Sequence, residues 1–120
     1  MNEPRDLSIR LFEFSVDVIK FLRKLPKAVE YQVIYYQLVK CATSAGANYE
    51  EAQAAISKPD FHNKIIISLK EMRESNYWLR ILKAVIESEP NILIELDVLI
   101  KESHELKSIL GAIGNKTKKK

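Results

Sequence analysis

The chain has 120 residues, a length typical of one domain, and 47% of them are hydrophobic, which is enough to build one core. With 29% charged residues and only three glycines and four prolines, the composition excludes collagen-like and low-complexity chains. The single cysteine, Cys41, has no partner for an internal disulfide, and the first residues lack the basic-then-apolar pattern of a secretory signal. No apolar run approaches the ~18 residues of a membrane span. We therefore expect a cytoplasmic, helical protein.

The positive charge is unevenly distributed. The net charge is +3, with 19 Lys and Arg against 16 Asp and Glu, and the last five residues hold four of the lysines. Residues 1–115 are therefore close to neutral. A short Lys cluster of this kind contacts phosphate or keeps the protein in solution. The cluster consists of Lys116, Lys118, Lys119 and Lys120.

Two amphipathic segments are expected in the first half of the chain, at about 6–25 and 28–56. Their apolar residues recur at alternating intervals of four and three, which places them on one face of a helix. Pro26 ends the first segment because it disfavours helical geometry at Leu25. In the second segment the apolar face comprises Tyr31, Tyr35, Leu38, Ala42, Ala45, Tyr49, Ala52 and Ile56.

Two further segments are expected at about 58–87 and 89–110, with the same spacing. Ser57 and Asp60 form a capping-box pattern, in which each side chain accepts a hydrogen bond from the backbone of the other. Ser88-Glu89-Pro90 repeats this start signal. Gly111 and Gly114 loosen the last helix.

Short connections between four amphipathic helices force each helix to run antiparallel to the one before it. The fold class predicted is all-α, an antiparallel up-down-up-down four-helix bundle. The 3.5-residue average spacing adds a left-handed coil. We assign residues 1–113 to this single domain and residues 114–120 to a basic, disordered tail.

The apolar surface exceeds what one bundle core needs. The first and third segments each carry a second stripe, and such a stripe usually meets another subunit. We expect a homo-oligomer, the alternative being one wide core. The candidate interface residues are Ile9, Phe12, Val16, Ile19, Trp78, Ile81 and Val85.

Small side chains surround Gly46 in the second segment. Glycine costs about 1 kcal/mol of helix propensity relative to alanine. We interpret Gly46 as leaving room for a closely approaching neighbour, which would compensate for this cost. Ser68 and Ser75 of the third segment would supply a matching narrow face.

Four polar residues on the second and third segments, Asn48, Glu51, Glu71 and Glu74, lie beside apolar stripes. If they converge, burial raises the pKa values of the carboxyl groups, and the cluster becomes a candidate acid/base or metal site for a small enzyme. The alternative is a hydrogen-bonded network that fixes helix register, or carboxylates exposed to solvent.

Other catalytic signatures are absent from the sequence. A di-iron bundle needs Glu-x-x-His pairs, but Lys101 precedes His104 by three residues and Pro59 precedes His62 by three. No phosphate-binding glycine loop and no nucleophile motif occur. We expect no catalytic residues, no cofactor and no metal, and hence a protein that is not an enzyme.

Basic residues gather towards the end of the first segment, and the nearby acidic residues Glu13, Asp17 and Glu30 reduce their net charge. Together with the C-terminal lysines they are candidates for contacts with RNA or DNA. The candidate contacts are Arg10, Lys20, Arg23, Lys24, Lys27, Lys116, Lys118, Lys119 and Lys120.

Several motifs resemble those of the 23S rRNA intervening sequence proteins. They are the stretch from Gln37 to Ala52, the Ser57–Phe61 turn, Leu69-Lys70-Glu71 and Tyr77-Trp78-Leu79. The family commonly has a small polar residue where this chain has Cys41. In the family, the residue before Gly-Ala-Asn is usually aliphatic or small. In this chain that residue is Ala45.

This resemblance implies a bacterial, ribosomal-protein-like four-helix bundle that assembles into a homopentamer. A similar bundle serves as the accessory protein of diversity-generating retroelements, where it binds a reverse transcriptase and nucleic acid. By that analogy the partners are a second copy of the chain and RNA, DNA or a nucleic-acid enzyme.

Overall fold

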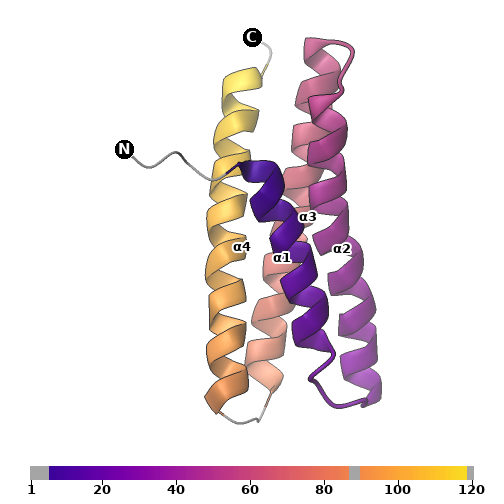
Figure 1. Ribbon diagram of the computed structural model, residues 1–120, viewed down its shortest axis with the longest axis vertical. Helices are drawn as coiled ribbons and strands as arrows, with labels where there is room; N and C mark the ends of the chain where they lie inside the picture. The colour runs from indigo at the N-terminus through magenta and orange to yellow at the C-terminus, as the bar shows by residue number, and fades with distance from the viewer. Residues whose placement is uncertain (1–5, 87–89, 119–120) are drawn as a thin grey trace.

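The computed structural model describes residues 6–86 and 90–118. These residues form four α-helices and no strand. The helices pack lengthwise against one another, and the first is the shortest (Figure 1). The prediction of an all-α protein with four helices is confirmed. The helices are α1 (Leu7–Leu22), α2 (Val29–Gln53), α3 (Lys58–Val85) and α4 (Pro90–Thr117).

The turn after α1 starts earlier than the sequence pattern predicts. The α-helix ends at Leu22, and a tighter turn follows, in which Lys24 N donates to Phe21 O and Leu25 N donates to Leu22 O. Leu25 still packs against the core with 9% of its surface exposed. The helix stops here because Pro26 has no amide hydrogen to donate to Leu22 O and disfavours helical geometry at Leu25.

The α2–α3 turn also differs from the prediction. Helix α2 ends at Gln53, and Ile56, which the pattern assigns to the apolar face, is 94% exposed. Ser57 caps α3 as expected, its hydroxyl accepting from Asp60 N at 3.1 Å. The Asp60 carboxylate, however, accepts from Ile56 N at 3.2 Å. Residues 87 and 89, the predicted end of the third segment and start of the fourth, lie outside the described residues, as does Ser88.

Helix α4 continues to Thr117, so the disordered tail predicted from residue 114 is wrong for residues 114–117. Gly114 is buried, and a Cβ built there would lie 3.2 Å from Ile66 Cδ1. One turn further, Thr117 Oγ1 lies 2.8 Å from His62 Nδ1. Packing against α3 therefore holds the helix past the two glycines.

Besides the exposed Ile56, the core departs from the predicted faces at the start of α2. There Ile34 is buried and Tyr35 is 36% exposed, although the pattern places Tyr35 inside. At 3.6 residues per turn, Ile34 lies about 40° around the helix from buried Leu38, whereas Tyr35 lies about 60° away. The largest fully buried side chains are Phe14, Phe21, Leu11, Leu22, Leu38, Ile65, Met72, Leu79, Leu82, Leu96, Leu106 and Leu110.

Buried hydroxyl groups join α2 to α3. Ser68 Oγ donates to Ala45 O at 2.7 Å, and Ser75 Oγ contacts Cys41 Sγ at 3.2 Å while also lying 2.9 Å from Glu71 O in its own helix. Both serines are fully buried. As residue numbers rise along α3 they fall along α2, so these contacts also fix how the two helices are aligned.

A second buried network joins α3 to α4. Asn76 Nδ2 donates to Ser103 Oγ at 2.9 Å, and Ser103 Oγ donates to Ile100 O at 2.8 Å. Arg80 Nε donates to Asn76 Oδ1 at 2.9 Å. Because each of these polar groups has a partner, the network fixes the register of the helices at little desolvation cost.

Gly46 faces α1 rather than the serines of α3. A Cβ at this position would lie 3.6 Å from Leu11 Cβ and 3.7 Å from Leu11 O. These are ordinary van der Waals distances. The predicted neighbour is thus corrected from Ser68 and Ser75 to Leu11, and the approach is not close enough to require glycine.

Candidate functional site

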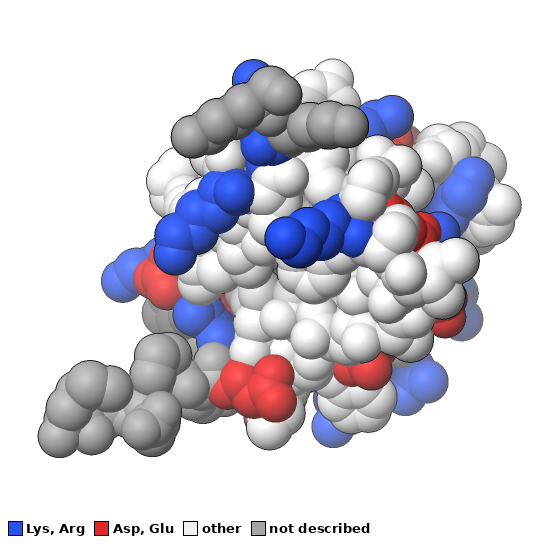
Figure 2. Space-filling view, turned by 90° about the horizontal axis from the view of Figure 1, so that it is seen from above, with Lys and Arg blue, Asp and Glu red and all other residues white. Residues whose placement is uncertain are grey.

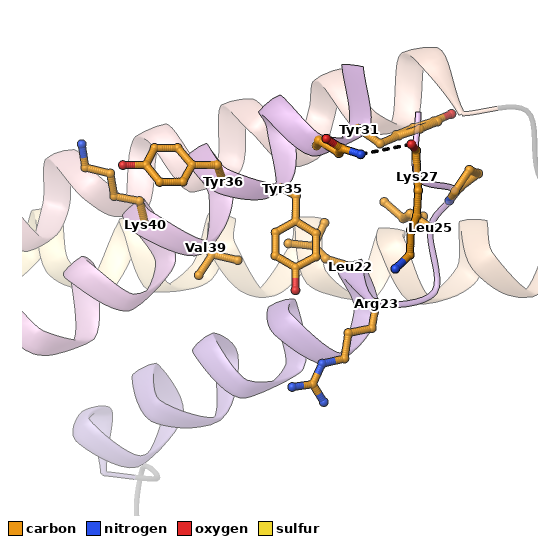
Figure 3. A pocket seen from close by; sticks show the side chains of 11 residues that line it. Leu22, Arg23, Leu25, Lys27, Tyr31, Tyr35, Tyr36, Val39 and Lys40 are labelled. Carbon is orange, nitrogen blue, oxygen red and sulfur yellow. Dashed lines mark hydrogen bonds between the residues drawn. The ribbon is translucent and has the colours of Figure 1, made fainter. Parts of the chain in front are cut away.

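A groove with a volume of about 590 Å³ lies where the end of α1, the following turn and the first half of α2 meet. Buried Leu22 and Leu25 and half-buried Val39 contribute its apolar surface. In Figure 3, Tyr35 extends from α2 towards α1, and Tyr36 lies beside Lys40. We call this site the tyrosine groove; its lining residues are Leu22, Arg23, Leu25, Pro26, Lys27, Tyr31, Gln32, Tyr35, Tyr36, Val39 and Lys40.

The tyrosine groove carries positive charge without a carboxylate in its lining. Arg23, Lys27 and Lys40 are all exposed, and none of them takes part in an ion pair with the described residues. Lys40 Nζ lies 6.0 Å from the centroid of the Tyr36 ring, within cation–π range. Exposed cations beside aromatic rings form the combination that binds single-stranded nucleic acids.

Two of the basic residues predicted to contact nucleic acid are instead paired within the protein. Arg10 binds Glu102 on α4 at 2.7 Å and also reaches Glu105, and Lys24 binds Glu95 on α4 at 2.7 Å. The sequence pattern could not reveal these partners, which are distant in the chain. Arg23 and Lys27 do line the groove, while Lys20 is exposed outside its lining.

Lys116 and Lys118 lie at another end of the molecule. Lys116 is exposed in the last turn of α4, and Lys118 lines a separate hollow of about 520 Å³ with Lys58 and His62. Seen from this end, Lys and Arg side chains are interspersed with carboxylates and uncharged surface (Figure 2). Lys119 and Lys120 lie outside the described residues.

The predicted cluster of Asn48, Glu51, Glu71 and Glu74 does not assemble. The Ser68–Ala45 contact lies between its two halves, because α2 continues past Ala45 to Asn48 and Glu51 while α3 continues past Ser68 to the other two. Asn48 Nδ2 donates to Ser44 O in its own helix, and Glu51 is exposed.

Glu71 and Glu74 do influence each other. Burial, followed by the negative charge of Glu74, raises the pKa of Glu71, and Lys40 and Lys70 oppose this shift. In the described part of the chain, no three His, Cys, Asp or Glu side chains gather closely enough to hold a metal ion.

The expected interface residues differ in exposure. Phe12 is 70%, Ile9 51% and Val85 48% exposed. Val16 and Ile19 are half-buried, and Trp78 and Ile81 pack against the core. Trp78 Nε1 is buried without an acceptor among the described residues. Exposed apolar side chains that the sequence pattern missed are Val29, Val33, Ile94 and Val98.

The sequence pattern also misses the aromatic side of the groove. It assigns Tyr31 and Tyr35 to the core and gives no role in a site to Tyr36 and Lys40. A local signal is present, since Lys40 follows Tyr36 by one helical turn and the two residues therefore share a face.

These features define an all-α protein with four packed helices. The chain belongs to the 23S rRNA-intervening sequence protein family, whose model matches residues 7–112. The resemblance carried by the motifs is thereby confirmed. None of the helices within residues 6–86 and 90–118 combines the length and apolar character needed to cross a bilayer.

A solved structure supports the same assignment. It is the crystal structure of a protein of unknown function from the S23 ribosomal protein family of Bacteroides thetaiotaomicron VPI-5482. The two chains are 31% identical with a TM-score of 0.77, and the match covers 91% of this chain and 98% of the other. No curated protein gives a significant sequence match.

Proposed function

We propose that this protein is a non-enzymatic, homo-oligomeric scaffold of the bacterial cytoplasm that binds RNA through phosphate contacts. The observation that carries this proposal is the tyrosine groove, where Arg23, Lys27 and Lys40 surround a hollow without a carboxylate in its lining. Cations that form no ion pair within the protein are free to replace the counterions of a phosphate backbone. The family description names an intervening sequence of 23S rRNA, which agrees with an RNA partner.

The exposed apolar surface supports the oligomeric part of the proposal. In the described residues, α1 packs against α2 and α4 but not against α3, so the outer faces of α1 and α3 belong to different sides of the molecule. Contact between α1 of one copy and α3 of the next is heterologous, and heterologous contacts form a ring when the rotation from copy to copy closes. We take the ring to be a pentamer of left-handed, up-down-up-down bundles, as the family resemblance implies.

The RNA part is tested by measuring the affinity of the protein for a structured RNA at low and near-physiological salt. We expect the logarithm of the affinity to fall linearly with the logarithm of the salt concentration. Replacing Arg23 and Lys27 by Gln should reduce that slope by about one for each phosphate that is no longer neutralised. Lys101→Gln on α4 is the matched control. Absence of binding at both salt concentrations would overturn the proposal.

The oligomer is tested by light scattering on the same samples. Phe12→Asp places a charge on the exposed face of α1 and should yield monomers, with the helical circular dichroism signal retained. Ile94→Asp, on the exposed surface of α4, is the control and should leave the mass unchanged. A wild-type mass equal to one chain of 13.8 kDa would contradict the scaffold.

A further inference from the structure

We infer that the tyrosine groove binds an unpaired segment of RNA, with bases stacked on the rings of Tyr35 and Tyr36 and phosphates held by Arg23, Lys27 and Lys40. This inference rests on the proposed function and narrows it from RNA in general to single-stranded RNA. The rings and the cations then have different roles: the rings select unpaired bases, and the cations bind any phosphate backbone.

The two rings are available to a ligand. Tyr36 is 63% and Tyr35 36% exposed, although both lie between buried Ile34 and Leu38 in the sequence. Neither hydroxyl group has a hydrogen-bond partner in the described part of the chain. An exposed aromatic ring gains stacking energy from any free base face, whereas the bases of a duplex are already stacked on one another.

The cationic side chains of the groove lie close enough to the tyrosine rings to contact the phosphates of a stacked strand. Lys40 Nζ stands 6.0 Å from the Tyr36 ring centroid, so a base on that ring keeps its phosphate within reach of the ammonium group. Arg23 and Lys27 line the groove from the α1 side and the connecting turn. Lys40 also attracts the carboxylate of Glu71 and so opposes the rise in its pKa. Arg23 and Lys27 are therefore the more fully available phosphate contacts.

The size and polarity of the groove suit a short stretch of an RNA strand. Its volume of about 590 Å³ lies in the range of about 300–1,000 Å³ that is typical of ligand sites. The free hydroxyl groups of Tyr35 and Tyr36 can donate to or accept from the ribose 2′-hydroxyl group, which distinguishes RNA from DNA. Leu22, Leu25 and Val39 supply apolar surface for the faces of the bases.

The experiment compares three labelled probes by fluorescence anisotropy: a short oligouridine, an RNA duplex of equal length and the corresponding DNA single strand. The RNA single strand should bind most tightly. Tyr36→Ala should weaken its binding by about 5- to 150-fold, the range expected when one base stack is removed, without changing the salt slope. Tyr36→Phe keeps the ring and should retain most of the affinity.

The controls separate this inference from the proposed function. Tyr77→Ala removes an exposed tyrosine of α3, outside the groove, and should leave binding unchanged. Equal binding of duplex and single strand, unaffected by Tyr35→Ala and Tyr36→Ala but weakened by Lys27→Gln, would overturn the inference and leave RNA binding standing. Equal binding of DNA would overturn the assignment to RNA, and absence of binding to all probes would overturn both proposals.

Discussion

Arg10 and Glu102 form a two-pronged ion pair that joins α1 to α4. Arg10 Nε donates to Glu102 Oε2 at 3.0 Å, and Nη2 donates to Oε1 at 2.7 Å. A third bond reaches Glu105 Oε1 at 3.1 Å. Hydrogen bonding to Glu102 raises the pKa of Arg10. The residue is thus committed to holding α1 in place rather than to binding phosphate.

Arg10→Ala should therefore destabilise the fold without changing the salt dependence of RNA binding. Removing a partly buried, charge-assisted pair lowers the free energy of unfolding by about 1–3 kcal/mol. Arg10→Lys keeps the charge but not the fork and should recover only part of this loss. Urea denaturation measures the effect. The control is Lys24→Ala, which breaks the more exposed pair with Glu95 and should cost less than about 1 kcal/mol. Equal losses in the two variants would contradict this assignment.

Gly46→Ala should stabilise the protein. The new methyl group would meet Leu11 at ordinary contact distance, and alanine gains up to about 1 kcal/mol of helix propensity over glycine. Thermal and urea unfolding should both move to higher midpoints. Gly114→Ala is the comparison, because its methyl group would lie 3.2 Å from Ile66 Cδ1 and some of the same gain should be cancelled. A lower midpoint for Gly46→Ala would show that α1 cannot accommodate the methyl group.

Cys41 should resist alkylation in the folded protein. Burial raises the pKa of this thiol to about 11, and the thiolate is the reactive form. Iodoacetamide at pH 8 should label Cys41 slowly in buffer and rapidly in denaturing urea. The labelling rate between these limits reports how often the α2–α3 interface opens. Rapid labelling of the native protein would show that the interface is not closed around Ser75 and Cys41.

Glu71→Gln should make the protein more stable at neutral pH. Since burial raises the pKa of Glu71 above its ordinary 4.5, the folded state binds this proton more tightly than the unfolded state. The wild type therefore loses stability as the pH rises from about 4.5 through the native pKa, and the loss is complete above it. Urea midpoints across this range should show the variant's advantage vanish below pH 4.5. Glu50→Gln, on the exposed surface of α2, is the control, and an equal gain there would contradict burial as the cause.

The four helices could be predicted because their signals are local. The spacing of apolar residues, the Ser57 cap and the break at Pro26 all act within one or two turns of chain. The end of α4 could not be predicted this way. The glycine at position 114 predicts a helix end from local sequence alone. Its packing against Ile66 of α3 nevertheless keeps the helix intact.

The tyrosine groove could be predicted only in part. Arg23 and Lys27 stand out in the sequence as basic residues near the end of the first helix. The pattern assigns Tyr35 to the core because it follows the alternation by four and three, whereas at 3.6 residues per turn Ile34 lies closer to the face of buried Leu38. It misassigns Arg10 because Glu102 lies 92 positions away.

The contact between His62 and Thr117 joins the last turn of α4 to the first turns of α3. Thr117 Oγ1 lies 2.8 Å from His62 Nδ1, 2.9 Å from Ile113 O and 3.3 Å from Gly114 O. Because a hydroxyl group can both donate and accept, Thr117 accepts from His62 when Nδ1 carries the ring hydrogen and donates to Nδ1 when the hydrogen is on Nε2. The end of α4 thus keeps a polar anchor on α3 whichever nitrogen of the neutral ring holds the hydrogen.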